Sequence, residues 1–227
     1  MRIRTADYGL WTTARTIVIG VLGLLCVACS SGSFFESDLP VPTRYVIAPP
    51  AAAETATASA ASQVDLAIGR PDVAPGLDTE RIAVLRGHEL DYYRGALWSG
   101  SVLETVQTFL VAALQDQKRF RSVATEQARI AGDYLLDIEV RDFQSEYASP
   151  GALPVAHVTL VCRLIRIGDR KMVDTIAVTG SQPASENRLA SVAEAFQSVM
   201  RQLSLELSEK TAALIASDVN SKPAGTT

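Results

Sequence analysis

The most regular alternation of apolar and charged residues in this sequence runs from Asp133 to Tyr147. A period of two turns one set of side chains toward a core and the other toward water, which predicts a β-strand with one buried face. The expected buried set begins with Leu136, Ile138 and Val140, and the exposed set with Asp137, Glu139 and Arg141. The parity changes at Phe143, so we expect a β-bulge near Arg141-Asp142 that restores it.

Two further runs continue this pattern and predict a hairpin. Val155 to Ile167 alternates in the same way, and Lys171 to Thr179 returns as the next strand. The connection between them, Gly168-Asp169-Arg170, has the length and the glycine typical of a hairpin turn. A loop is expected from Gly180 to Ser185. Shorter β-type runs precede the long strand: Arg44 to Ile47, Val64 to Gly69, Arg81 to Arg86 and Phe120 to Val123.

Two stretches have the three-and-four spacing of an amphipathic helix. The first begins near Val102, where Ser101 and Glu104 match a capping box that satisfies free backbone donors. The second runs from about Arg188 to about Ala216. This order of strands, helix, strands and helix predicts an α/β (α+β) fold. We expect a two-layer sandwich with a mostly antiparallel sheet and two long amphipathic helices on one face.

The N-terminus has the composition of a secretory signal peptide. Arginines precede about twelve apolar or small residues from Ile17 to Ala28, fewer than the roughly 20 needed for a membrane-spanning helix. An uncleaved anchor is the alternative. The small Ala28 before Cys29 is typical of a lipoprotein cleavage site. We therefore expect removal of residues 1–28 and attachment of lipid to Cys29 through a diacylglycerol thioether.

Composition divides the rest of the chain. Residues 29–43 are mostly polar or small and include prolines, which predicts a lipidated tether. Residues 44–216 contain every predicted strand and helix and suit one domain. Inside that domain, residues 51–63 are rich in Ala, Ser and Thr without an apolar period, so a flexible loop is expected there. Residues 217–227 are polar and predicted to be a disordered tail.

Charge and residue types argue against several functions. The net charge of −4 argues against binding of nucleic acid, which is usually recognised by a positively charged surface. His88 and His157 have no His or Cys at metal-ligand spacing, and Cys162 lies in an apolar strand pattern where burial is expected. The sequence lacks the Gly-x-Ser-x-Gly elbow, the phosphate-binding loop and the dinucleotide fingerprint. We therefore expect no metal, no cofactor and no enzymatic activity.

Three aromatic residues, Tyr92, Tyr93 and Trp98, cluster before the first helix. One interpretation is that they fix the hairpin and the helix start to the core. The other is an exposed partner-binding patch, because Tyr and Trp are enriched at interfaces. The sequence leaves both interpretations open.

The order of these features is similar to that of a known family. A lipoprotein cleavage site and the first strands lead to a turn, an Ile-x-Val strand, a tyrosine-rich hairpin and a Trp that opens a helix. The matching residues are Leu77-Asp78, Ile82-Ala83-Val84, Leu90-Asp91-Tyr92 and Trp98. Over about Arg44 to Ala216 the chain resembles the ABC-type transport auxiliary lipoproteins, which include the lipoprotein of the paraquat-inducible system.

This resemblance implies a non-catalytic lipoprotein that faces the periplasm. Its expected partners are an ABC permease, its ATPase and a substrate-binding protein of the mammalian-cell-entry type, in a system that moves lipids or other hydrophobic molecules between membranes. Ser30 after the cysteine favours the outer membrane, by resemblance to enterobacterial-type sorting. A homo-oligomer stays open. The competing hypothesis is an outer-membrane assembly lipoprotein, such as a pilotin or a β-barrel partner. The expected docking surfaces are the Tyr92–Trp98 region and an exposed sheet edge.

Overall fold

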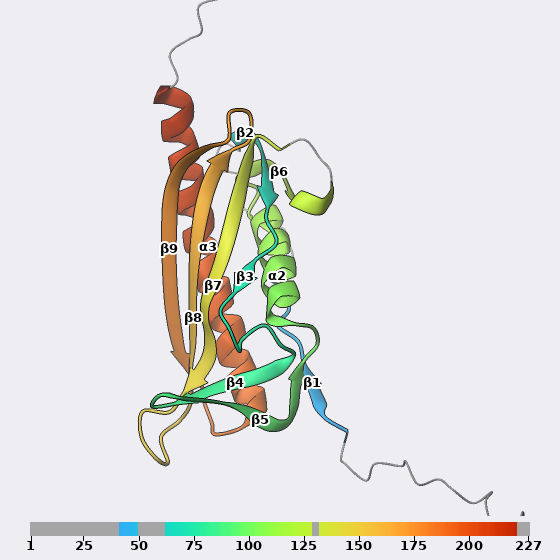
Figure 1. The fold of residues 1–227 in the computed structure, drawn as a ribbon, viewed down its shortest axis with the longest axis vertical. Helices are drawn as coiled ribbons and strands as arrows, with labels where there is room; N and C mark the ends of the chain where they lie inside the picture. Colours follow the sequence, from blue (N-terminus) through green and yellow to red (C-terminus); the bar gives the residue numbers. More distant parts are fainter. Residues whose placement is uncertain (1–40, 50–61, 129–131, 222–227) are drawn as a thin grey trace, which may run out of the picture. The chain divides into compact units, whose positions relative to one another are not determined.

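A computed structural model describes residues 41–49, 62–128 and 132–221 (Figure 1). Contacts divide the chain into two units, Met1–Pro40 and Val41–Thr227, and the second contains all the described residues. The signal peptide, Cys29 and most of the predicted tether and 51–63 loop therefore lie outside the described residues.

The second unit contains a nine-stranded mixed sheet, within the described residues. Its strands are β1 (Thr43–Tyr45), β2 (Ser62–Ile68), β3 (Asp72–Val73), β4 (Arg81–Arg86), β5 (Glu89–Trp98), β6 (Phe120–Thr125), β7 (Tyr134–Glu146), β8 (Val155–Arg166) and β9 (Lys171–Pro183). One path through the sheet runs β1-β5-β4-β7-β2-β6, and β8 and β9 extend it from β7. The α+β class predicted from the sequence is confirmed.

The three longest strands form an antiparallel meander, β7-β8-β9. Between Val140 and Asp142 the β7–β8 register shifts by one residue, which leaves Arg141 without a partner on β8. This is the predicted bulge. It returns Phe143 to the buried face, where its side chain is 0% exposed.

The shorter strands make the sheet mixed. β4 and β5 form the predicted antiparallel hairpin, but β2, β3 and β4 each pair with β7 in parallel. β1 also pairs in parallel with β5, and β6 with β2. The strands of each parallel pair are joined by a connection much longer than a hairpin turn; the connection between β2 and β6, for example, includes β3, β4, β5 and a helix.

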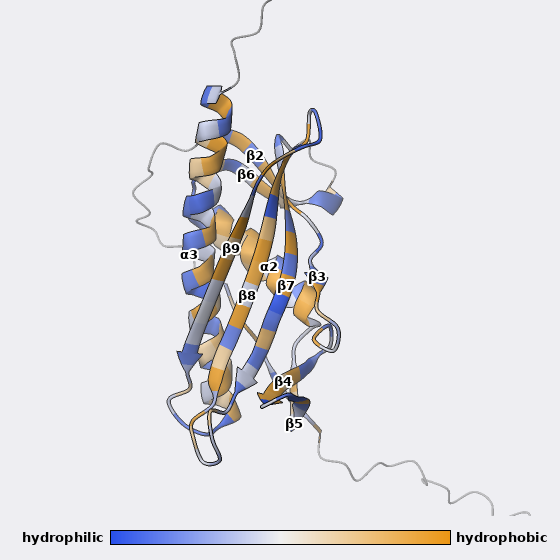
Figure 2. Ribbon diagram, turned by 60° about the vertical axis from the view of Figure 1, so that its left-hand side comes forward, coloured by the Kyte–Doolittle hydropathy of each residue, from blue (hydrophilic) through white to orange (hydrophobic). Residues whose placement is uncertain are grey.

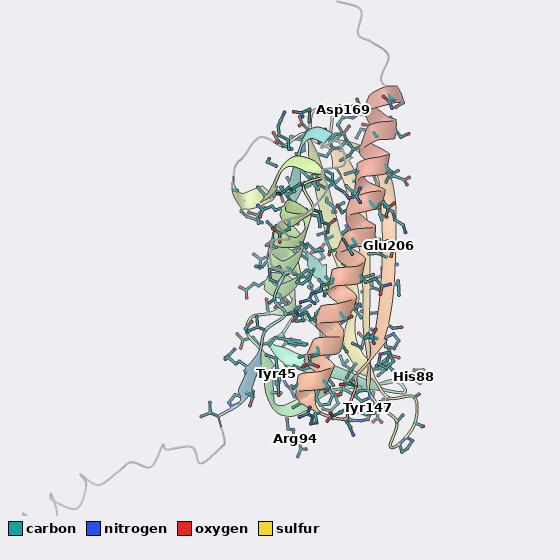
Figure 3. All side chains as sticks on the ribbon, turned by 180° about the vertical axis from the view of Figure 1, so that it is seen from behind. Tyr45, His88, Arg94, Tyr147, Asp169 and Glu206 are labelled. Atoms are coloured by element: carbon teal, nitrogen blue, oxygen red, sulfur yellow. The ribbon has the colours of Figure 1, made fainter. Side chains whose placement is uncertain are left out.

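Two helices, α2 (Val102–Asp116) and α3 (Leu189–Ser221), cover one face of the sheet. Figure 3 shows them side by side in front of the strands. The predicted capping box begins α2: the Ser101 hydroxyl accepts a hydrogen bond from Glu104 N at 3.3 Å, and the Glu104 carboxylate accepts one from Ser101 N at 3.2 Å. A short 3₁₀ turn, η2 (Glu126–Ala128), follows β6.

Three predicted boundaries of loops or tails differ in the structure. The flexible loop predicted over residues 51–63 is wrong at its end, because β2 begins at Ser62. The disordered tail predicted from residue 217 is wrong at its start, because α3 continues to Ser221. The loop predicted from Gly180 is also wrong at its start, because β9 continues to Pro183. Gly180 lets the strand pass close to α3: a Cβ at this position would lie 3.0 Å from Val199 Cγ1.

The core lies between the sheet and the two helices. Hydrophilic and hydrophobic residues alternate along β7 and around α3, and the hydrophobic side chains meet in this layer (Figure 2). Fully burying one such side chain contributes roughly 1.5–3 kcal/mol to folding. The largest fully buried side chains include Trp98, Phe109, Phe143, Phe196 and Leu136. Among the described helices, none combines the length and the apolar character needed to cross a membrane.

Candidate docking site

Trp98, at the end of β5, lies in the core. Its side chain is 1% exposed. The indole packs edge-to-face against Phe143 of β7 and Phe196 of α3, with ring centroids 5.9 Å and 5.3 Å away. The two phenylalanine rings stack on each other at 4.9 Å. Trp98 therefore fixes the hairpin and the start of α2 to the core, and its placement in an exposed patch is corrected.

Tyr92 is half-buried and secures the turn that precedes β4. Its hydroxyl donates a hydrogen bond to Gly76 O at 2.7 Å, and the Arg81 guanidinium lies 3.7 Å from the centre of its ring. Gly76 has a φ of +85°, a conformation that glycine adopts without strain. The contact lets the turn close with Leu77 buried in the core. Tyr92 thus has a structural role, although part of its side chain is exposed.

Tyr93 is half-buried and belongs to a chain of hydroxyl groups. Its oxygen lies 2.8 Å from Ser145 Oγ and donates to the Tyr147 hydroxyl at 3.3 Å, so Ser145 is the donor to Tyr93. Tyr147 in turn donates to Asn187 Oδ1 at 3.0 Å. Burial raises the pKa of Tyr93 above its ordinary value. The chain of hydroxyl groups joins β5, β7 and the segment before α3, and burial keeps Tyr93 neutral.

The exposed part of this end of the unit is a cleft beside Tyr147. Its volume is about 550 Å³, and it is lined by Arg86, Gly87, Tyr147, residues 148–151 and Asn187. Tyr147, His88 and Arg94 lie at this end (Figure 3). Arg86 is 5.5 Å from the centre of the Tyr147 ring and also pairs with Asp91 at 3.4 Å. Tyr147 and Asn187 could not be identified as site residues from the sequence, because no local pattern links them.

A second polar cluster lies at the opposite end of α3. Asp218 accepts hydrogen bonds from Arg166 Nε at 2.9 Å and from the Tyr134 hydroxyl at 2.7 Å. Arg166 also lowers the pKa of Asp218, and burial followed by the Asp218 hydrogen bond raises the pKa of Tyr134 to about 12. These contacts tie the last turns of α3 to β7 and β8. They explain why residues 217–221 continue the helix.

The predicted exposed sheet edge is the free side of β9. Among the described strands, β9 pairs only with β8. The other terminal strands of the sheet, β1 and β6, are short and contain Arg44 and Arg121 respectively, features that commonly protect edges. β9 has 13 residues and no charged residue from Thr175 to Pro183. This edge is therefore the least protected in the described part of the sheet.

The model of one protein family matches residues 45–208, nearly the whole folded unit. The description of that family is the ABC-type transport auxiliary lipoprotein component. The chain belongs to this family. The resemblance found in the sequence is thereby confirmed.

Solved structures agree with the fold of this auxiliary lipoprotein. A crystal structure of a protein from Xanthomonas campestris is 29% identical, with a TM-score of 0.70, and the match covers 79% of this chain and 99% of that one. A second crystal structure, described as an uncharacterized protein, is 12% identical with a TM-score of 0.60 and covers 75% and 99%. No curated protein sequence matches the chain. The second likeness concerns the fold alone.

The remaining reactive side chains of the auxiliary lipoprotein have structural surroundings. Cys162 is 0% exposed, and burial raises the pKa of its thiol to about 12, so the nucleophilic thiolate is scarce near neutral pH. His157 lies 3.7 Å from Glu146 on the open sheet face. In the part of the chain that the structure describes, no group of three or more His, Cys, Asp or Glu side chains could hold a metal ion.

Proposed function

We propose that this protein is a non-catalytic outer-membrane lipoprotein and an auxiliary component of an ABC-type transporter linked to mammalian-cell-entry proteins. In this role it is anchored through lipid on Cys29 and faces the periplasm. The transporter moves lipids or other hydrophobic molecules across the cell envelope. The family match over residues 45–208 is the observation that carries the proposal.

The side-chain chemistry of the folded unit supports a binding role. The aromatic residues before α2 hold the fold together, and the thiol of Cys162 is buried. The open sheet face carries cross-strand ion pairs, such as Arg163 with Asp137 at 2.9 Å, which are typical of a solvated surface. Exposed groups for contact with other proteins remain at the Tyr147 cleft and along β9.

Two measurements test this proposal. The first is recovery of partners: the tagged full chain, purified from detergent-solubilised envelope, should bring down the permease, its ATPase and a mammalian-cell-entry protein. Recovery of only a secretin or a β-barrel would instead support the assembly-lipoprotein hypothesis. The second is fractionation of a Cys29→Ala variant, which should leave the membrane fraction. A variant that still sediments with membranes would refute lipidation at Cys29.

A further inference from the structure

The outward backbone groups of Thr179 and Ser181 on the free β9 edge are open, whereas groups on either side of them, at Thr175, Ala177 and Pro183, make contacts within the chain. The Asp174 carboxylate accepts a hydrogen bond from Thr175 N at 2.7 Å, and Lys210 Nζ donates to Ala177 O at 3.5 Å. At the other end the Gln182 side-chain amide donates to Pro183 O at 3.4 Å. The lysine contact shows that the Ala177 carbonyl points away from β8. Because strand groups alternate in direction, the backbone groups of Thr179 and Ser181 point the same way.

No hydrogen bond within the described residues reaches these outward backbone groups of Thr179 and Ser181. Both residues are exposed. An extended, uncharged edge of this kind is a template for another strand. Natural edges usually carry a charge, a proline or a bulge at the centre, and β9 has its bulge and its charges near Lys171–Asp174 and its proline at position 183. Thr179 and Ser181 have none of these protections.

Two hollows lie between the β9 edge and α3. One of about 310 Å³ is lined by Thr175, Ile176, Ala177, Lys210, Ala213 and Leu214. The other, of about 180 Å³, is lined by Gln182, Pro183, Ser185, Ser191, Glu194, Ala195 and Ser198. Alternate side chains of a strand added at this edge would point toward α3 and enter these hollows. Small or apolar side chains suit the first hollow, because its helix side carries Ala213 and Leu214.

A second copy related by a two-fold axis is a poor occupant of the edge. Two identical strands that face each other across a two-fold axis run antiparallel. The β1 strand of one copy would then lie at one end of the pair, and the β1 strand of the other copy at the opposite end. α3 has 33 residues and is therefore about 50 Å long. The chain from Cys29 to Val41 spans at most about 40 Å. If α3 of both copies stood perpendicular to the membrane, the proposed lipid of only one copy could reach it.

We propose that the free edge of β9 is where a protein of the transporter docks, by adding an extended segment as a further strand of the sheet. The segment would pair with Thr179 and Ser181 through its backbone and place alternate small or apolar side chains in the two hollows beside α3. This inference rests on the proposed function, since it names the contact through which the auxiliary lipoprotein meets its partners.

The test compares variants of the tagged full chain, co-expressed with the permease, its ATPase and the mammalian-cell-entry protein and purified in mild detergent. Thr179→Pro removes one outward N–H and leaves the bonds to β8 in place. It should lower the recovered transport proteins at least about fivefold, since an unpaired group in an interface costs about 1–3 kcal/mol. Thr179→Ala keeps the N–H and should bind like the parent chain.

Thr159→Lys is the matched control for the open sheet face. Thr159 lies directly opposite Thr179, with 3.3 Å between their hydroxyl groups, but on the inner strand β8. This variant should retain its partners. Full binding in Thr179→Pro would overturn the edge as the contact, and loss of binding in Thr159→Lys alone would place the contact on the open sheet face.

Hydrogen exchange gives a readout that does not depend on a variant folding. In the complex, the amides of Thr179 and Ser181 should exchange at least about tenfold more slowly than in the free chain. Unchanged exchange in a complex that forms overturns the inference but keeps the proposed function. Failure of the parent chain to recover any transport protein overturns the proposed function. If the exchange of these amides slows in the purified chain alone as its concentration rises, a second copy is the occupant, and the inference is overturned.

Discussion

Replacement of Trp98 tests whether this residue anchors the fold or forms a partner surface. Trp98→Leu removes both edge-to-face contacts with Phe143 and Phe196, each worth about 1 kcal/mol. It also leaves part of a fully buried site unfilled, which adds about 1 kcal/mol. We therefore expect a loss of about 3 kcal/mol in the free energy of unfolding.

Urea denaturation of the purified chain, followed by far-ultraviolet circular dichroism, measures this loss. With a slope of about 2 kcal/mol per molar urea, the midpoint should fall by about 1.5 M. In a double-mutant cycle with Phe196→Leu, the two changes should couple by about 1 kcal/mol, because they share one aromatic contact. Leu205→Ala, at a side chain that is 58% exposed, is the control and should change stability by less than about 0.5 kcal/mol.

Two results would refute this reasoning. A loss below about 1 kcal/mol in Trp98→Leu would show that the indole is not an anchor of the core. Normal stability combined with loss of the transport proteins in co-purification would restore Trp98 to the docking surface.

Further predictions concern single contacts. Arg121 holds the pKa of Asp65 at about 2, below its ordinary 3.8, so this pair should contribute stability above pH 4 that disappears as the pH falls toward 2; an Asp65→Asn variant with the same acid profile as the parent would contradict this. Ser101→Ala removes the cap of α2 and should cost about 1 kcal/mol in urea denaturation, whereas Ser101→Asp should retain most of the stability. The thiol of Cys162 should resist a thiol reagent at pH 8 until the chain is unfolded in urea, and rapid labelling of the folded chain would show that it is accessible.

Features that depend on neighbouring residues could be predicted from the sequence. The parity change at Phe143 located the bulge, and the spacing of Ser101 and Glu104 located the start of α2. The apolar alternation of β8 placed Cys162 in the core. In each case the information lies within a few residues, because strand parity and helix capping are local properties.

Features that depend on distant residues could not be predicted. The end of α3 is set by Asp218, whose partner Arg166 lies 52 positions away, so the polar composition after residue 216 was misleading. Trp98 is the last residue of β5, so no alternation continues after it to show on which face its side chain lies. Its burial depends on packing against Phe143 and Phe196, which are distant in the sequence. The parallel pairing of β2, β3 and β4 with β7 depends on crossover connections that leave no periodic signal.

The first strand also determines how the folded unit would carry a mechanical load. β1 has three residues and is held to the rest of the unit by its parallel ladder with β5, by Arg44, which donates to Trp98 O at 3.2 Å, and by Ser99 N, which donates to Tyr45 O at 2.8 Å. A pull on a lipid anchor at Cys29 would enter the fold at this strand and pass directly to the aromatic cluster around Trp98. Under the proposed anchoring at Cys29, β1 would thus pass the load to Trp98, one of the residues that close the core.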